Sequence, residues 1–199
     1  MTTHLKDIQQ SKKYLLLDTN IIQYAGNKNK ALSENVRTQL LSLEKSGYSI
    51  VISQYSVFEN LQGLWGNKAE EATALLAKFE QKIVSKEVLV LSSILGGLYG
   101  RENDLKDIAD GDKIIAATAM LTNAVVLTRN HRDFPIPFFI QENFYDIIYV
   151  DGDRKKLLDL GLYKPNTKII ESKVAELEPQ NKTIRNRKKV KGNKKKKSR

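Results

Sequence analysis

The sequence contains no cysteine, and this absence excludes three classes of protein at once. Without thiols the chain cannot be a disulfide scaffold, a thiolate zinc protein or an enzyme with a cysteine nucleophile. A membrane-spanning segment is also missing, since the longest apolar stretch lies within 114–121, far below the roughly 18 to 20 residues that cross a bilayer. Residues 1–13 offer only Leu5 and Ile8 as large aliphatic side chains, so no secretory signal is predicted. We expect a cytoplasmic protein without a membrane partner.

Acidic residues are absent from the last part of the chain. Residues 181–199 hold eight lysines and three arginines, which leaves 22 basic and 23 acidic residues in 1–180. The net charge of +10 therefore belongs to this tail, and the body is close to neutral. The tail is either a solubilising end or a segment that gathers a polyanion such as RNA.

A length of 199 residues suits one full-sized domain with a tail. No internal repeat is visible. The predicted organisation is a flexible N-terminus over 1–12, one globular domain over 13–150, a partly helical C-terminal extension over 151–178, and a disordered lysine-rich tail over 179–199.

Short apolar runs alternate with helical segments along the domain. Strands are expected at 14–17, 50–52, 124–127 and 146–150, with another apolar run at 88–91. Helices are expected at 19–25, 33–46, from residue 53 onward, 68–82, 92–99, from residue 112 onward, and 153–161. Such alternation predicts a parallel sheet with helices on both faces.

Acidic residues occupy the junctions where apolar runs meet polar turns or helix starts. Asp18 follows the first strand, Glu59 lies about one turn inside a helix, and Asp112 opens an alanine-rich helix. A fourth position, Asn130 or Asp133, follows a later strand. In a parallel sheet these junctions meet at the carboxyl edge, and oxygen ligands suit Mg²⁺ and Mn²⁺. The pattern predicts a carboxylate metal site and, with it, phosphodiester hydrolysis.

Each of these residues also has an ordinary structural interpretation. Asp18 can cap the helix that follows it, and Glu59 can face solvent. Asp112 suits a helix N-terminus because the helix dipole favours an acid there. Asp110 belongs either to a solvated loop or to the surroundings of the metal. His131 is either a surface residue of its loop or a general base.

Four segments in order, LLLDTNII, ISQYSVFENL, DGDKIIAATA and LTRNHRDF, resemble the motifs of the PIN-domain ribonucleases, especially the VapC-type toxins of toxin–antitoxin pairs. The resemblance covers about residues 14–150. It implies a PIN-like three-layer α/β fold with a central, mostly parallel sheet of about five strands and helices on both faces. It further implies a Mg²⁺- or Mn²⁺-dependent endoribonuclease that cuts single-stranded RNA, leaving a 5′-phosphate and a 3′-hydroxyl.

The resemblance also assigns roles to individual residues. Asp18, Glu59 and Asp112 match the metal ligands of the family. Asn130 stands where the family often has an aspartate, and Asp133 follows three residues later, so both are candidate catalytic residues. Because an amide supplies no charge, one firmly bound metal is expected. Side chains expected to orient the first acid or a bound water are Thr19, Asn20 and Thr128.

Contacts with RNA are predicted next to the fourth motif and in the tail. Arg129 and Arg132 flank the motif, while Tyr55 and Trp65 either stack on bases or serve packing. The family also implies a cognate antitoxin and a homodimer. The tail residues assigned to RNA are Lys188, Lys189, Lys194 and Lys195.

Two other functions compete with the nuclease. A catalytically weak or inactive PIN-fold RNA-binding protein would rely on the basic tail, an interpretation that Asn130 keeps open and the three acids oppose. A phosphatase of the haloacid-dehalogenase type also begins with an apolar strand and an aspartate. It needs a second aspartate two residues later, where this chain has Asn20.

Overall fold

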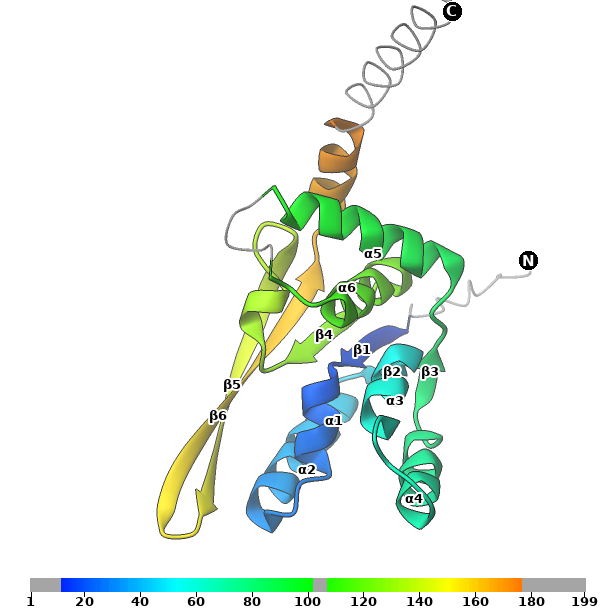
Figure 1. The fold of residues 1–199 in the computed structure, drawn as a ribbon. Helices are drawn as coiled ribbons and strands as arrows, with labels where there is room; N and C mark the ends of the chain where they lie inside the picture. Colours follow the sequence, from blue (N-terminus) through cyan, green and yellow to red (C-terminus); the bar gives the residue numbers. More distant parts are fainter. Residues whose placement is uncertain (1–11, 102–106, 177–199) are drawn as a thin grey trace, which may run out of the picture.

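The sheet at the centre of the molecule contains six strands in the order β3-β2-β1-β4-β6-β5 (Figure 1). The computed structural model describes residues 12–101 and 107–176. β3, β2, β1 and β4 run parallel, and β6 pairs antiparallel with β4 and β5. The predicted fold class is confirmed, with six strands in place of about five. The strands are β1 (Lys13–Leu17), β2 (Tyr48–Ser53), β3 (Glu80–Lys82), β4 (Val125–Thr128), β5 (Phe139–Asp151) and β6 (Arg154–Pro165).

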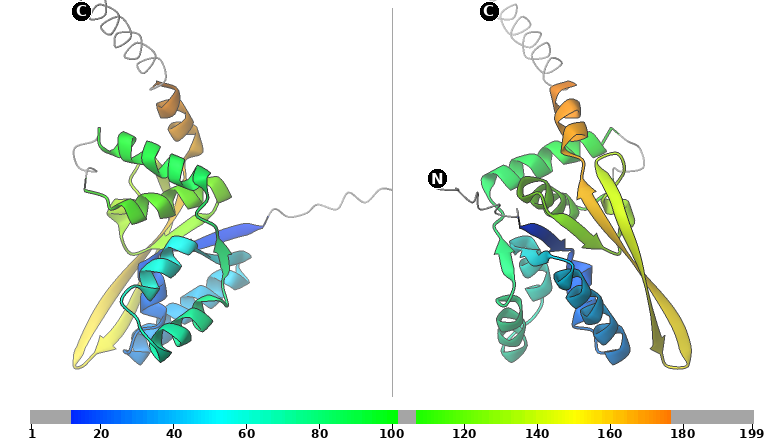
Figure 2. Two further views of the ribbon diagram at one scale, coloured as in Figure 1. Left: turned by 45° about the vertical axis from the view of Figure 1, so that its right-hand side comes forward. Right: turned by 180° about the vertical axis from the view of Figure 1, so that it is seen from behind.

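Helices cover both faces of the sheet, as the views in Figure 2 show. In β1, Leu16 packs into an apolar cluster with α5 and α6, while Leu15 and Leu17 pack into a second cluster with α1 and α2. This alternation follows from the period of two in a strand. The helices are α1 (Thr19–Ala25), α2 (Lys30–Lys45), α3 (Gln54–Leu61), α4 (Asn67–Leu76), α5 (Lys86–Tyr99) and α6 (Asp110–Thr122).

The stretch between α3 and α6 differs from the sequence expectation. The helix expected at 68–82 ends at Leu76, and its last residues form β3, which pairs with β2. The apolar run 88–91 and the short helix 92–99 are one helix, α5. The Ser85 hydroxyl caps α5 by accepting from the Val88 backbone N–H. β3 was missed because its sequence, EQK, has no apolar residue at the edge of the sheet.

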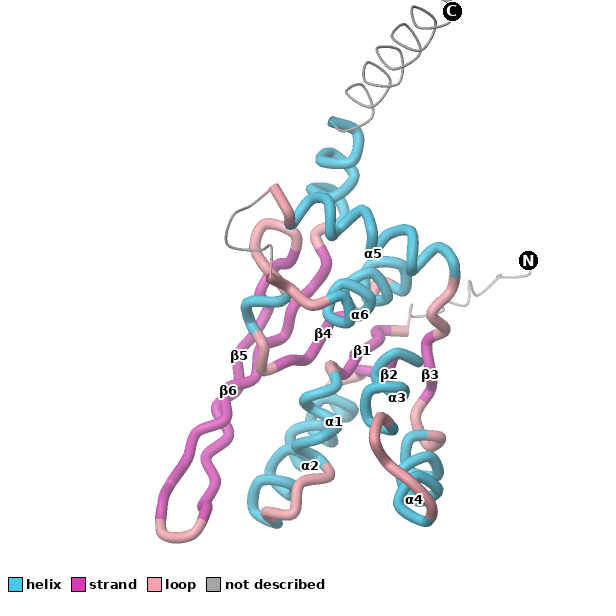
Figure 3. Tube along the Cα trace, in the orientation of Figure 1, coloured by secondary structure: helices cyan, strands magenta, loops and turns pink. Residues whose placement is uncertain are grey.

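The end of the domain is a long antiparallel hairpin of β5 and β6, clearly visible in Figure 3. The helix expected at 153–161 is wrong, because these residues belong to the turn and to β6. β6 lies between β4 and β5 in the sheet, so the expected domain boundary at residue 150 falls inside this hairpin. A further helical segment, 167–176, follows β6.

No helix among the described residues is long and apolar enough to cross a membrane. The flexible N-terminus expected over 1–12 lies outside the described residues except for Lys12. The tail predicted over 179–199 lies entirely outside them, including its four lysines assigned to RNA.

Candidate metal and active site

Asp18 lies at the carboxyl end of β1, where its backbone N–H donates to the Leu127 carbonyl of the neighbouring strand β4 (3.0 Å). Its side chain is 3% exposed. One carboxylate oxygen, Oδ1, accepts from the Thr19 backbone N–H at 2.6 Å and so caps α1. The other, Oδ2, accepts from the Thr128 hydroxyl and the Asn20 amide, each at 2.5 Å. The capping role and the place in the acid cluster therefore coexist.

Glu59 reaches the same place from α3. The Thr19 hydroxyl donates to Glu59 Oε2, so one residue touches both acids through its backbone and its side chain. Glu59 is partly exposed. It therefore faces Asp18 across the start of α1, and it is not simply a solvent-facing glutamate.

Asp112 and Asp133 form the other side of the cluster. Asp112 lies in the first turn of α6, and Asp133 is buried in a short 3₁₀ helix, His131–Asp133, after β4. Their carboxyl groups lie close enough to share a hydrogen bond when one of them is protonated, and this interaction adds to the rise in the pKa of Asp112. The Asn130 amide donates to the Asp133 carboxylate. At the ambiguous fourth position, the acid is thus Asp133, and Asn130 supports it.

Burial and neighbouring charges raise the pKa values of Asp18 and Asp112. Burial raises the pKa of Asp18 to about 6; hydrogen bonds from Thr128 and Thr19 oppose this rise, and the charges of Asp133 and Glu59 add to it. The pKa of Asp112 is also raised, first by burial and then by the charges of Asp133 and Asp18. Crowded, buried carboxylates of this kind are typical of functional sites.

The donor set fits a hard divalent cation in chemistry and in charge. All the donors are oxygens, and a cation would offset the repulsion between the carboxylates. The side chains are nevertheless arranged as hydrogen-bonded neighbours. Within 12–101 and 107–176, no three His, Cys, Asp or Glu side chains are positioned to ligate one ion together. Binding a metal here therefore requires side-chain rotation, above all in the Asp112–Asp133 pair.

The arginines predicted to bind RNA lie at the rim of this site. The exposed Arg129 donates to the Tyr24 hydroxyl (2.9 Å), and its backbone N–H donates to the Asn20 side chain. The exposed Arg132 pairs with Asp107 at 3.7 Å. Burial raises the pKa of Asp133 and the charge of Arg132 opposes this rise, so this arginine acts on the acid cluster from its rim.

Other residues singled out from the sequence have clear positions. The Tyr55 ring packs over Gly111 at the start of α6, which favours a packing role. Trp65 is 86% exposed, in the segment between α3 and α4. Asp110 points outward, 93% exposed, and pairs with Lys113.

His131 is not the surface histidine that its loop position indicated. It is partly buried, and both ring nitrogens have partners: Nδ1 bonds the Tyr163 hydroxyl at 3.0 Å and Nε2 bonds Asp159 at 2.8 Å. Gly161 makes room for it, since a Cβ there would lie 3.0 Å from Nδ1. Its role is to join the fourth motif to the β5–β6 hairpin.

Tyr99 was not identified by sequence reasoning. It is fully buried at the end of α5, and among the described residues its hydroxyl has no hydrogen-bond partner. Burial, together with the charges of Asp133 and Asp112, raises the pKa of this phenol. No sequence signal marks Tyr99, because only the packing of α5 on α6 brings it toward the acids.

No protein-family model and no curated protein sequence matches the chain. Among solved structures, it is similar to VapBC2 from Rickettsia felis bound to a DNA fragment from the promoter, with 24% identity, 59% of this chain and 88% of that chain covered, and a TM-score of 0.49. It is also similar to a toxin–antitoxin complex from Klebsiella pneumoniae, with 27% identity, coverage of 62% and 92%, and a TM-score of 0.46.

Proposed function

We propose that the chain is a metal-dependent endoribonuclease of the VapC type that hydrolyses single-stranded RNA. The observation that carries this proposal is the convergence of Asp18, Glu59, Asp112 and Asp133. They come from four separate elements, β1, α3, α6 and the turn after β4, and three of them influence the pKa of Asp18 or Asp112 through their charges. A purely structural role gives no reason to crowd four acids, two of them buried, at one edge of a sheet.

Asp18, Glu59 and Asp112 are the proposed ligands of Mg²⁺ or Mn²⁺, with Asp133 next to them. When bound, the ion neutralises charge on the scissile phosphate and lowers the pKa of an attacking water. Thr128 and Asn20 hold Asp18 in one orientation. Such support from outside the ligand set is typical of metal sites.

The protein's own groups then handle the proton and the substrate. Thr19 holds Glu59 through Oε2, so Oε1 is the proposed acceptor of the proton that an attacking water loses. Arg129 and Arg132, at the rim, are the proposed contacts to RNA phosphates. In the tail, Lys188, Lys189, Lys194 and Lys195 remain proposed RNA contacts.

Partners other than RNA also belong to this proposal. The family resemblance implies a cognate antitoxin that blocks the site and a homodimer. Toxicity on expression, relieved by an antitoxin and by Asp18→Asn, is the expected cellular behaviour.

One observation favours the alternative of a PIN-fold RNA-binding protein with a weak or inactive site. In the part of the chain that the structure describes, no three acids are arranged as ligands of one ion. If the hydrogen bonds of Asp112 and Asp133 are stronger than the attraction of a cation, the chain would bind RNA without cutting it.

A cleavage assay on purified full-length chain separates the two functions. We expect labelled single-stranded RNA to be cut with Mg²⁺ or Mn²⁺ and to remain whole with EDTA. Asp18→Asn should lower cleavage by about a thousandfold, equivalent to roughly 4 kcal/mol of barrier, without unfolding the chain. The matched control is Asp153→Asn, an exposed acid in the β5–β6 turn.

Two outcomes would reject the nuclease. Metal-dependent cleavage retained by Asp18→Asn would show that the activity does not come from this site. Tight RNA binding by the wild-type chain without any cleavage would instead establish the RNA-binding alternative.

A further inference from the structure

Tyr99, the last residue of α5, is fully buried in an apolar cluster that α5 forms with α6, which it crosses in Figure 1. The centroid of its ring lies 5.2 Å from that of Phe138. Phe134, which follows Asp133 directly, belongs to the same cluster, as do several residues of α6, the helix that carries Asp112 in its first turn. The ring of Tyr99 is therefore packed among the two segments that hold these acids.

The hydroxyl group of Tyr99 distinguishes this side chain from its neighbours. Among the described residues it has no hydrogen-bond partner. A buried polar group without a partner destabilises a protein, because it has lost its hydrogen bonds to water and has gained none. Plain phenyl rings occupy the same cluster at Phe134, Phe138 and Phe139, so a phenylalanine would pack here without that cost. The hydroxyl is useful only if another state of the molecule supplies an acceptor.

The acids of the candidate site act on this hydroxyl. Burial raises the pKa of the Tyr99 phenol, and the charges of Asp133 and then Asp112 add to the rise. A phenol donates strongly to an ionised carboxylate, because a charged acceptor makes a hydrogen bond roughly twice as strong as a neutral one. Since Asp133 has the larger effect of the two acids, it is the first candidate for the acceptor.

Asp133 changes its surroundings when a cation enters the site. In the metal-free chain the Asn130 amide donates to its carboxylate, and Asp112 shares a hydrogen bond with it when protonated. Metals bind ionised carboxylates, so a cation on Asp112 displaces that proton. Asp133 then loses the donor that Asp112 provided, at the same time as the pair rotates. An ionised Asp133 gains from a new donor, and the Tyr99 hydroxyl gains from an acceptor.

We propose that Tyr99 is a positioning residue of the candidate site, whose hydroxyl donates a hydrogen bond to Asp133 when a divalent cation is bound. This inference rests on the proposed metal site. Tyr99 does for Asp133 what Thr128 and Asn20 do for Asp18, since it orients the carboxylate from outside the ligand set. It does so only in the metal-loaded chain and thereby links metal binding to the packing of α5 on α6.

Calorimetric titration of the full-length chain with Mn²⁺ tests the proposal. We expect Tyr99→Phe to bind Mn²⁺ about tenfold more weakly than the wild type, as is usual when a hydrogen-bond partner of a metal site is removed. In EDTA, its midpoint of urea unfolding should equal or exceed that of the wild type, because the hydroxyl has no partner without the metal.

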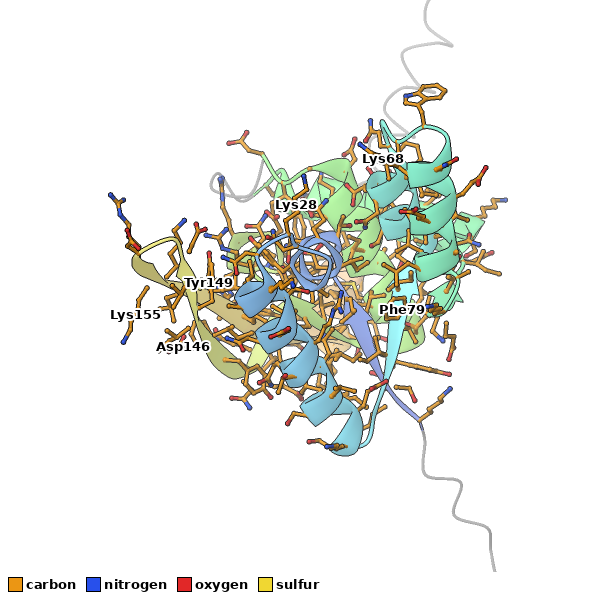
Figure 4. The ribbon with its side chains drawn as sticks, turned by 90° about the horizontal axis from the view of Figure 1, so that it is seen from below. Lys28, Lys68, Phe79, Asp146, Tyr149 and Lys155 are labelled. Atoms are coloured by element: carbon orange, nitrogen blue, oxygen red, sulfur yellow. The ribbon has the colours of Figure 1, made fainter. Side chains whose placement is uncertain are left out.

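The matched control is Tyr149→Phe, which removes the same hydroxyl group elsewhere. Tyr149 is a partly exposed residue of the β5–β6 hairpin (Figure 4) and packs against the apolar cluster on the other face of the sheet. This variant should keep the Mn²⁺ affinity of the wild type.

Ultraviolet difference spectra separate a positioning role from a general effect on packing. A buried phenol that begins to donate to a carboxylate shifts its absorption to longer wavelength. Addition of Mn²⁺ to the wild-type chain and to Tyr149→Phe should produce this shift, whereas Tyr99→Phe should lack it.

A double-mutant cycle identifies the acceptor. In an Asp133→Asn background the carboxylate is already gone, so adding Tyr99→Phe should lower Mn²⁺ affinity by less than about twofold. An equal loss in both backgrounds would mean that the hydroxyl does not act through Asp133.

The role of Tyr99 is overturned by wild-type Mn²⁺ affinity in Tyr99→Phe, by a lower urea midpoint of this variant in EDTA, or by an unchanged difference spectrum. In each of these cases the metal site itself stands, because the wild type still binds Mn²⁺. A wild-type chain that binds no Mn²⁺ rejects the metal site and the role of Tyr99 with it. None of these measurements depends on RNA cleavage.

Discussion

The two sides of the acid cluster are held in different ways. Asp18 receives three neutral donors, from Thr19, Asn20 and Thr128, and is oriented without help from any charge. Asp112 and Asp133 instead face each other as two acids, and their proximity raises the pKa of Asp112. Asp18 is therefore held in one orientation before any ligand binds. For Asp112 and Asp133, the repulsion between the two carboxylates is relieved only when a proton or a cation lies between their oxygens. pH and metal should therefore act mainly on this pair.

The largest expected effect comes from removing the shared proton altogether. In Asp112→Asn, the amide can donate to Asp133 without a proton, so the metal-free chain should gain about 1 kcal/mol in free energy of unfolding. RNA cleavage should fall about a thousandfold because a ligand is lost. Denaturant titration and cleavage assays measure the two effects. Asp110→Asn, two residues away and exposed, is the control, and equal losses in both variants would contradict the assignment.

The pH dependence of stability tests the same contrast. Groups whose pKa is raised on folding stabilise the protein fully below their unfolded pKa, and this contribution is lost as pH rises through the folded pKa. Asp18, with a pKa of about 6, should therefore cost the metal-free chain up to about 3 kcal/mol between roughly pH 4 and 7. The raised pKa of Asp112 extends the loss to higher pH.

Urea titrations in EDTA from about pH 4 to pH 8 measure this loss, and adding Mn²⁺ should restore more stability at pH 8 than at pH 5 because ions bind ionised carboxylates. Asp18→Asn should flatten the lower part of the curve and Asp112→Asn the upper part. If the free energy of unfolding instead rises with pH, and equally in the wild type and both variants, then folding does not raise the pKa values of Asp18 and Asp112.

Removing one of the hydrogen bonds that orient Asp18 should have a smaller effect on stability and metal affinity. Thr128→Val keeps the shape of a fully buried side chain but removes the hydroxyl that donates to Asp18 and accepts from the Asn130 backbone N–H at 2.8 Å. We expect a loss of about 1 to 3 kcal/mol in stability. Mn²⁺ affinity should fall about tenfold, measurable by calorimetry. Thr122→Val, whose hydroxyl bonds only within α6, serves as control; an unchanged Mn²⁺ affinity in Thr128→Val would argue against its supporting role.

The smallest change in stability and metal affinity is expected from adding a carboxylate at position 130. Asn130→Asp brings a further carboxylate next to Asp133, so the metal-free chain should lose about 1 kcal/mol. Mn²⁺ should bind a few-fold more tightly, with an effect of roughly 1 kcal/mol in the opposite direction. Calorimetric titration of Mn²⁺ checks this, and weaker binding would mean that the Asn130 amide, not a charge, is what the metal site requires.

Local signals made the acid cluster predictable. Asp18 and Thr128 end two apolar strands, and adjacent parallel strands place such residues side by side. The choice between Asn130 and Asp133 was not predictable, because a tight turn of three residues decides which one points inward. The position of Tyr99 near the acids could not be predicted for a different reason. The sequence of α5 gives no indication of which residues of α6 pack against it.

The β5–β6 hairpin was not predicted from the sequence, even though Leu158, Leu160 and Leu162 alternate at strand spacing. The lysines before them and the position after an apparent final strand favoured a helix. Strand pairing is long-range, so the pairing of β6 with β4 across the sheet leaves no mark in the local sequence. The β5–β6 hairpin therefore emerged from the structure alone.

Asn35 of α2 and Asn29, which caps α2, donate to β5 carbonyls and so affect aggregation. β5 is the last strand of the sheet, and the open backbone of such a strand can template further strands from other chains. Asn29 and Asn35 occupy carbonyls that an incoming strand would use. They thereby oppose the addition of further strands to the edge of the sheet. Association with other chains must then use side chains, which differ between proteins and so allow selective binding.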